Sequence, residues 1–229
     1  MKILLQLFFI NNEYTFNRWI TSFEAVPVYD DWELYIIGYV DDIYFDRFRE
    51  KLKIKSCTFI RNYYNHGKSF ILNNIVKFIN YDIILCFDGD IILNDKVAPV
   101  LEDKLITHNL DIIIPIQEDD NRNYIWNPIN VAENLFFVKN NYGLSGGIFL
   151  TKKAIIDNNP LPLVGSFGPE DVIWFSQLDK INIIVYVCNL VKIIHPSGEH
   201  KSYDIKYYIN LLDSLENVPM DKVINPKML

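Results

Sequence analysis

Apolar runs and amphipathic segments alternate along the first part of the chain. Nearly uninterrupted apolar residues predict buried strands over Ile3–Ile10, Glu33–Val40, Cys57–Ile60 and Asp82–Phe87. Between them, a period of 3.6 residues predicts three helices: one capped by Thr15, one from Asp41-Asp42 to Leu52, and one over Gly67–Ile79. This βαβαβ order is typical of a parallel sheet covered by helices on both faces.

The second part of the chain has a less regular pattern. It predicts a helix near Pro169–Leu178 and strands near Asp111–Ile116, Gly147–Leu150, Ile183–Tyr186 and Val191–Ile194. No Gly/Ser-rich linker or internal repeat divides the chain, so we expect one α/β domain over residues 1–229. Ligands of such sheets bind at the carboxyl ends of the strands, so the residues that follow each strand are the candidates for chemistry.

Composition narrows the class of protein. Half of the 229 residues are hydrophobic and 14% are aromatic, which is enough for a packed core. The formal charge of -7 disfavours nucleic acid as a partner. Cys57, Cys86 and Cys188 are scattered in apolar runs and indicate free thiols in a reducing compartment. No stretch has the length of a membrane span, and we expect a cytoplasmic protein, in the host cytoplasm if the source is viral.

The strongest chemical signal is Asp88-Gly89-Asp90, directly after the apolar strand Asp82–Phe87. Two adjacent carboxylates at a strand end repel each other, and a hard divalent cation would relieve that repulsion. An acidic turn explains Asp-Gly equally well in isolation, but a turn needs only one Asp. The position at the end of a central strand favours a metal site.

A second signal follows the last predicted strand. His195 comes directly after Val191–Ile194, and a neutral imidazole there can be a third metal ligand beside Asp88 and Asp90. Lys201, six residues later, can neutralise phosphate charge on a leaving group. Taken alone, His195 would more often be a strand-end loop residue.

Two further segments carry candidate residues. Glu170 and Asp171 follow Gly168-Pro169 at a predicted helix start, where acids are common; as catalytic groups, one would be a general base and the other would bind sugar. Gly146 and Gly147 precede a strand and would let the backbone approach a ligand closely.

One lysine stands at the start of the third predicted helix. Lys68 follows Gly67 there and would reach a phosphate at the helix N-terminus, although a lone lysine is more often a solvated surface residue.

The order of these motifs resembles GT-A glycosyltransferases. The tail from His195 through Gly198 and Lys201 to Tyr203 is similar to the His-x-x-Gly-x-x-Lys-Pro-Trp ending of the glycogenin and lipopolysaccharide-galactosyltransferase group, with Ser202 and Tyr203 as departures. The resemblance implies a Rossmann-like αβα sandwich with a mostly parallel central sheet. It implies a nucleotide-sugar-binding half over residues 1–95, and a half over 96–229 that completes the acceptor and metal sites.

The same resemblance assigns roles. Asp90 and His195 would bind Mn²⁺ (or Mg²⁺), Asp88 would touch metal or ribose, and Lys201 would touch the diphosphate of a UDP-sugar donor. Asp41 or Asp42, at the end of the second strand, would contact the nucleoside.

A second resemblance concerns the acids at the start of the helix predicted near Pro169–Leu178. Gly168-Pro169-Glu170-Asp171 is similar to the Gly-Gly-Glu-Asp stretch of β-1,4-galactosyltransferases, which implies Asp171 as the base and Glu170 as an acceptor contact. The first group retains anomeric configuration and the second inverts it, so retaining and inverting chemistry both stay open.

Other functions fit less well. A nucleotidyltransferase would carry a Gly-rich basic loop after the first strand, where this chain has Asn11-Asn12-Glu13-Tyr14, and a haloacid-dehalogenase-type phosphatase would carry its Asp-x-Asp after that strand. The expected function is transfer of a sugar to a hydroxyl of a glycan or glycoconjugate. The alternatives left open are a phage or viral enzyme that glycosylates hydroxymethylated DNA bases and a non-catalytic sugar- or nucleotide-binding protein.

Overall fold

The computed structural model describes residues 1–63, 67–117, 128–138, 147–162 and 170–195. The strands are β1 (Lys2–Ile10), β2 (Trp32–Val40), β3 (Thr58–Arg61), β4 (Ile83–Asp88), β5 (Ile112–Gln117), β6 (Pro128–Ala132), β7 (Leu135–Val138), β8 (Ile148–Lys152) and β9 (Val185–Ile193). The helices are α1 (Glu13–Ala25), α2 (Asp42–Leu52), α3 (Gly67–Asn74), the short 3₁₀ helix η1 (Val76–Phe78), α4 (Val97–Thr107), α5 (Lys153–Asn158) and α6 (Glu170–Lys180).

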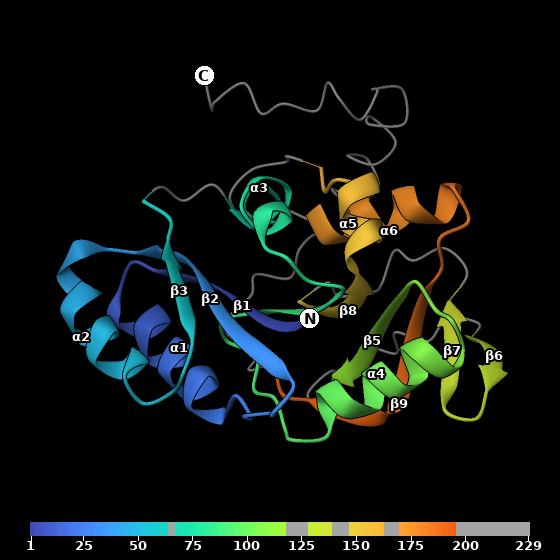
Figure 1. The fold of residues 1–229 in the computed structure, drawn as a ribbon, viewed down its shortest axis with the longest axis horizontal. Helices are drawn as coiled ribbons and strands as arrows, with labels where there is room; N and C mark the ends of the chain where they lie inside the picture. Colours follow the sequence, from blue (N-terminus) through green and yellow to red (C-terminus); the bar gives the residue numbers. More distant parts are fainter. Residues whose placement is uncertain (64–66, 118–127, 139–146, 163–169, 196–229) are drawn as a thin grey trace.

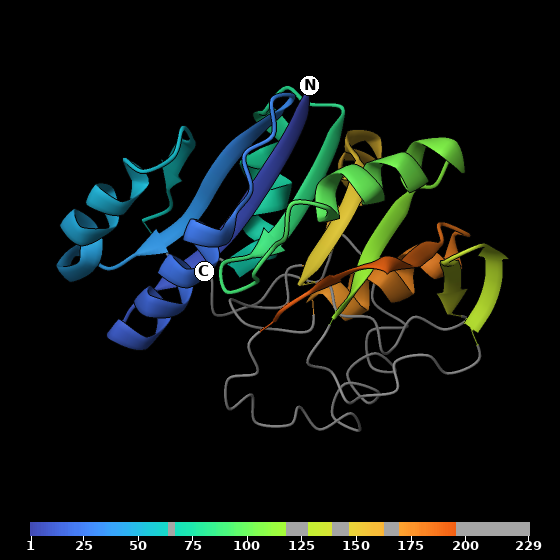
Figure 2. The ribbon, with the colours of Figure 1, turned by 90° about the horizontal axis from the view of Figure 1, so that it is seen from below.

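The strands form a nine-stranded sheet in the order β3-β2-β1-β4-β8-β5-β9-β7-β6. Strand β1 pairs in parallel with β2 and β4, β2 pairs in parallel with β3, and β5 pairs in parallel with β9. Strands β7 and β8 run against the others, because β8 is antiparallel to β4 and β5 and β7 is antiparallel to β6 and β9. The predicted mostly parallel α/β sheet is confirmed. The strands change direction progressively from β2 to β9, as the twist of a large sheet requires (Figure 2).

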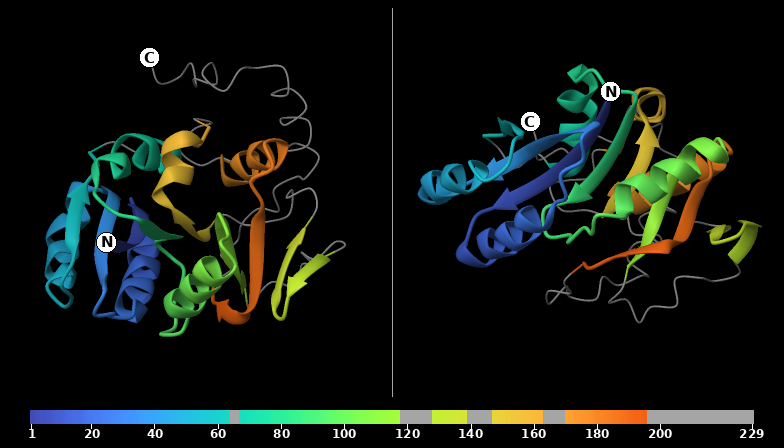
Figure 3. Two further views of the ribbon diagram at one scale, coloured as in Figure 1. Left: turned by 45° about the vertical axis from the view of Figure 1, so that its right-hand side comes forward. Right: turned by 60° about the horizontal axis from the view of Figure 1, so that its bottom comes forward.

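Helices cover both faces of the sheet. On one side lie α1, α2 and α4, and on the other lie α3, α5 and α6 (Figures 1 and 3). Side chains alternate along β1, so Leu5 packs into the core under α3, α5 and α6, whereas Leu4 packs under α4 and Phe8 under α1 and α2. Both faces are therefore buried, which explains why β1 reads as a continuous apolar run.

Helix α1 begins one turn earlier than the sequence predicts. Asn12, not Thr15, is the N-cap: its side chain accepts from the Thr15 amide at 2.9 Å. Thr15 completes the capping box, because its hydroxyl accepts from the Asn12 amide at 3.2 Å. Both residues are good caps, and the sequence pattern does not separate them.

Other boundaries also differ. The helix predicted over Gly67–Ile79 ends at Asn74 and is followed by η1. The two predicted strands Ile183–Tyr186 and Val191–Ile194 are one strand, β9, with a shift of register against β5 in its middle. The sequence pattern does not predict α4, α5, β6 and β7, which complete the second half of the sheet and the helices that cover it.

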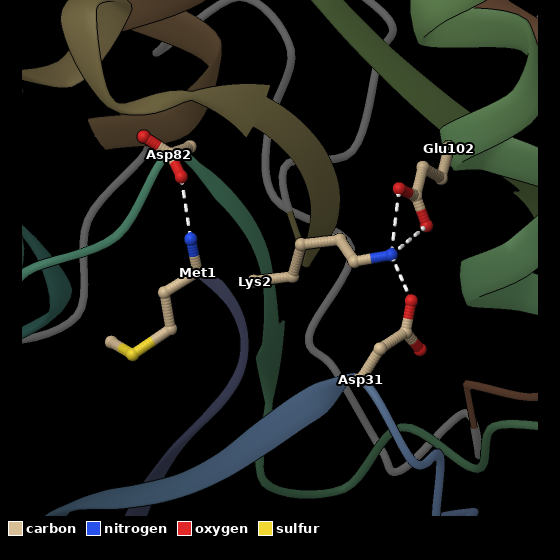
Figure 4. A network of polar contacts seen from close by, with 5 residues as sticks. All are labelled: Met1, Lys2, Asp31, Asp82 and Glu102. Atoms are coloured by element: carbon tan, nitrogen blue, oxygen red, sulfur yellow. Dashed lines mark hydrogen bonds and ion pairs between the residues drawn. The ribbon is translucent and has the colours of Figure 1, made fainter.

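A polar network holds the amino end of β1, at the end of the sheet opposite to the carboxyl ends of β1, β2 and β4. The ammonium of Lys2 contacts Asp31 and donates to both carboxylate oxygens of Glu102, at 2.9 and 3.0 Å, while the amino group of Met1 pairs with Asp82 (Figure 4). These contacts tie β1 to α4 and to the turn before β2. Among the helices that the structure describes, none is both long and apolar enough to cross a membrane.

Candidate functional site

The Asp88-Gly89-Asp90 turn lies against the carboxyl end of β1. The amide of Asp88 donates to the carbonyl of Gly147 at 2.8 Å, and the amide of Ile91 donates back to the Asp88 carbonyl at 3.1 Å. A Cβ on Gly89 would lie 2.8 Å from Phe8 Cβ and 2.9 Å from the Leu7 carbonyl oxygen. Only glycine fits there, because the obstructing atoms belong to the strand itself. The turn therefore holds both acids at a fixed place on the sheet edge.

Asp90 is held by two residues from opposite ends of the chain. Oδ2 of Asp90 lies 2.8 Å from Nη2 of Arg18 on α1, and Oδ1 lies 3.4 Å from Nε2 of His195. Burial alone would raise the pKa of the Asp90 carboxyl, but the hydrogen bond and charge of His195, together with Arg18, hold that pKa below its usual value. The same contact acts against burial at His195 and raises the imidazole pKa.

A short backbone pairing explains why His195 reaches Asp90. Ile92 and Ile194 form an antiparallel bridge, with the Ile92 amide donating to Ile194 at 2.8 Å and the Ile194 amide donating back at 3.3 Å. His195 follows Ile194 directly and Asp90 lies two residues before Ile92, so the bridge brings the two side chains close together. The predicted proximity of Asp90 and His195 is present in the structure.

Lys68 pairs with the other acid of the turn. Its ammonium, in the first turn of α3, lies 2.7 Å from Oδ1 of Asp88, and its side chain is 9% exposed. Burial alone would lower the lysine pKa, but the charges of Asp88, Asp171 and Glu170 raise it. For Asp88 burial outweighs the lysine, so the carboxyl pKa is raised.

Glu170 and Asp171 open α6 and lie near Lys68 and its partner Asp88. The Glu170 side chain is nearly fully buried, and burial, with the neighbouring charge of Asp171, raises its pKa to about 7 although Lys68 opposes this. Helix α6 is anchored by Trp174, whose indole donates to the Asn159 carbonyl at 2.7 Å and whose ring lies 5.4 Å from that of Phe149 on β8. This packing fixes the position of α6, whose first-turn acids lie near Lys68.

The remaining predicted residues lie elsewhere or outside the described part of the chain. Asp41 is the N-cap of α2, accepting from Ile43 at 3.3 Å, and Asp42 pairs with Arg61. Both follow β2, and no contact joins them to the acid cluster in the part of the chain that the structure describes. The carbonyl of Gly147 accepts a hydrogen bond from the Asp88 amide. Gly146 and Lys201 fall outside the described residues.

Arg18 is a site residue that the sequence pattern does not predict. Its guanidinium lies over the Tyr14 ring at 5.4 Å and donates to the Tyr14 hydroxyl at 2.9 Å besides pairing with Asp90. The order of the elements could have indicated it. Helix α1 starts at the carboxyl end of β1, and β1 is the parallel neighbour of β4, which Asp88 ends. A cation in the first turns of that helix is therefore a candidate for contact with Asp88 or Asp90.

The carboxylate of Asp90 and the imidazole of His195 are donor types that a divalent transition-metal ion accepts. Its Oδ1 and the Nε2 of His195 are 3.4 Å apart, and two ligands of one ion at about 2.1 Å lie roughly 3 to 3.5 Å apart. Within residues 1–63, 67–117, 128–138, 147–162 and 170–195, no group of three or more His, Cys, Asp or Glu side chains is arranged to hold a metal ion. The pair fits a divalent cation, and Asp88 as a third ligand stays a prediction.

No protein-family model matches this sequence, and no curated protein matches it either. Solved structures match it in fold. TarS 1–349 of S. aureus, in complex with UDP-GlcNAc, superposes with a TM-score of 0.66 at 15% identity, covering 96% of this chain and 69% of that one.

Two further structures agree. The mannosyltransferase PcManGT from Pyrobaculum calidifontis, with GDP-Man and Mn²⁺, gives a TM-score of 0.63 at 10% identity over 86% of this chain and 57% of that one. GalNAc-T7 with UDP, GalNAc and Mn²⁺ gives 0.66 at 10% identity over 93% and 48%. The fold of this chain is GT-A, as the motifs predicted, and the chain spans about half the length of these two proteins.

Proposed function

We propose that this protein is a metal-dependent glycosyltransferase that moves a sugar from a UDP-sugar donor to a hydroxyl of a glycan or glycoconjugate. The observation that carries the proposal is the meeting of Asp88, Asp90 and His195 with Glu170 and Asp171 at the carboxyl edge of a GT-A sheet. These residues come from three distant segments of the chain. A merely structural acidic turn would not collect a histidine and a second acid pair around it.

Asp90 and His195 would hold Mn²⁺, with Asp88 completing the set. The carboxylate oxygen and imidazole nitrogen suit a first-row divalent ion. When bound, such an ion supplies positive charge to the departing diphosphate. Lys201, Gly146 and Gly147 are proposed to contact that diphosphate, and Asp41 or Asp42 the nucleoside.

The reaction forms a bond between the acceptor oxygen and C1 of the donor sugar and breaks the bond between C1 and the diphosphate oxygen. The proton of the acceptor hydroxyl must leave as the new bond forms. In an inverting reaction Asp171, which is half-buried and so reachable, takes that proton. In a retaining reaction the acids of α6 orient the acceptor instead.

Glu170 suits a supporting role. Because Glu170 is only 8% exposed, it is less accessible to a substrate than the half-buried Asp171. A carboxyl with a pKa of about 7 is only partly ionised at neutral pH, so it adds less negative charge next to Asp171 than an ordinary glutamate would.

The test is nucleotide release from a panel of UDP- and GDP-sugars, with and without Mn²⁺. Mn²⁺-dependent release of UDP from one donor is the expected result, and it identifies the sugar. Donor binding without any turnover would favour the non-catalytic alternative, and turnover only on hydroxymethylated DNA would favour the DNA-base alternative.

A further inference from the structure

The two acids of the Asp88-Gly89-Asp90 turn each have a positively charged side chain of the protein beside them. Lys68 lies 2.7 Å from Asp88 and Arg18 lies 2.8 Å from Asp90. Repulsion between adjacent carboxylates, which in the sequence favours a metal ion, is therefore already relieved by the chain itself. At Asp90 the positive charge of Arg18 also affects metal binding, because Asp90 is a proposed ligand of the metal.

Arg18 and His195 take different oxygens of the Asp90 carboxylate. Arg18 lies against Oδ2, and the imidazole of His195 faces Oδ1. Arg18 thus leaves the oxygen that faces the second metal ligand available. It also fixes the rotation of the carboxylate, because the side chains of Arg18 and Asp90 are only 16% and 25% exposed.

Helix α1 is fixed to the same turn by a second contact one helical turn along. The hydroxyl of Ser22, fully buried, donates to the carbonyl of Ile91 and accepts from the side-chain Nε2 of Gln6 on β1 at 2.8 Å. Residues 18 and 22 lie on one face of the helix, since they are four residues apart. The helix therefore presents Arg18 to Asp90 from a rigid base.

We propose that Arg18 is the built-in counter-ion of Asp90: it positions the carboxylate with Oδ1 toward His195 and lowers the affinity of the site for Mn²⁺. This rests on the proposed function, in which Asp90 and His195 bind the metal. A fixed positive charge a few ångströms from the ion opposes its binding. A metal that binds weakly in the free enzyme is held firmly only when the diphosphate adds its own negative charge.

The experiment compares Mn²⁺ binding to four full-length proteins by electron paramagnetic resonance of the free ion. Arg18→Gln removes the charge but keeps a hydrogen-bonding group, Arg18→Lys keeps the charge, and Arg49→Gln removes an exposed arginine of α2 as a control for net charge. We expect Arg18→Gln to bind Mn²⁺ about tenfold more tightly than wild type, with Arg18→Lys and Arg49→Gln within about threefold of wild type.

Each other outcome counts against a specific statement. Equal or weaker Mn²⁺ binding by Arg18→Gln, with wild type binding normally, overturns the counter-ion role and leaves the proposed function in place. The same tightening in Arg49→Gln also overturns it, because the effect would then belong to net charge. Failure of all four proteins to bind Mn²⁺, with or without UDP, overturns the metal-dependent function and this inference with it.

Discussion

The ammonium of Lys68 lies 2.7 Å from Oδ1 of Asp88, and this ion pair joins the first turn of α3 to the end of β4. From the sequence, Lys68 was a candidate for binding phosphate at a helix N-terminus, and that role stays a prediction. In the structure, the lysine is the internal partner of a strand-end acid and lies close to the acids of α6. It therefore links the two acidic segments of the site.

The Lys68–Asp88 pair should contribute to stability. Lys68→Gln leaves the Asp88 carboxylate, whose side chain is 33% exposed, without its cation, so we expect a loss of about 1–2 kcal/mol in the free energy of unfolding, measured by denaturant without metal. The double variant Lys68→Gln/Asp88→Asn should lose clearly less than the sum of the single changes. Lys53→Gln, whose pair with Glu50 is also 2.7 Å but exposed, should change stability by less than about 0.5 kcal/mol. Strict additivity at 68 and 88 would show that the pair is not coupled.

Asp90→Ala should remove turnover without unfolding the protein. The change deletes a proposed metal ligand, so we expect a loss of roughly a hundredfold or more in kcat. Because the Asp90 side chain is partly exposed and belongs to no apolar cluster, the circular dichroism spectrum and the cooperative unfolding transition should persist. Asp95→Ala, an exposed acid in the same loop, is the matched control and should keep wild-type rates. Wild-type turnover by Asp90→Ala with saturating Mn²⁺ would remove Asp90 from the metal site.

Asp171→Asn distinguishes the two stereochemical alternatives. If Asp171 is the base of an inverting reaction, kcat should fall by about 10²–10⁴-fold while the affinity for the donor is nearly kept, because the amide cannot take the proton. Asp179→Asn, in the last turn of the same helix, should have little effect on either. A loss of only a few fold at Asp171 would favour retention, and NMR of the product anomer would settle the matter independently.

Glu170 should make stability depend on pH. Its folded pKa of about 7 lies above its ordinary value of 4.5 because burial penalises the charge. A raised carboxyl pKa contributes stability that is present below about pH 4.5 and is lost as pH rises toward 7, since the unfolded chain ionises more readily. Glu170→Gln removes this dependence. Relative to wild type, the variant should gain free energy of unfolding between pH 4.5 and 7, by a few kcal/mol at most, and the difference should level off above that range. A constant difference across this range would mean that Glu170 titrates normally in the folded protein.

Much of the first half of the fold could be predicted from the sequence. The apolar runs of β1, β2 and β4 are buried on both faces, so their hydrophobicity is continuous and their position is plain. Helix α1 was found because Phe16, Trp19 and Phe23 repeat at the helical period and are all buried. Its start was placed wrongly, since Asn12 and Thr15 are both competent caps and only the completed capping box assigns their roles.

The second half was predicted less well. The sequence predicts two strands in place of β9, because Asn189 and Leu190 are exposed at the register shift and interrupt the apolar pattern. Strands β6 and β7 were missed because they are short. Their pairing also depends on β9, which lies far along the chain.

By itself, the sequence determined the α/β class, the Asp88-Gly89-Asp90 turn at the end of a central strand, and the acids that open α6. These features are local, because hydrophobic periodicity and turn chemistry operate over a few residues. The sequence also predicts that His195 lies beside these acids, but only the tertiary structure decided that Arg18 and Lys68 contact them. Such contacts depend on strand order, on the Ile92–Ile194 bridge and on the packing of α1 and α3, which join residues distant in sequence. No periodicity along the chain encodes which strand ends become neighbours, so the charges that surround Asp88 and Asp90 followed only from the folded sheet.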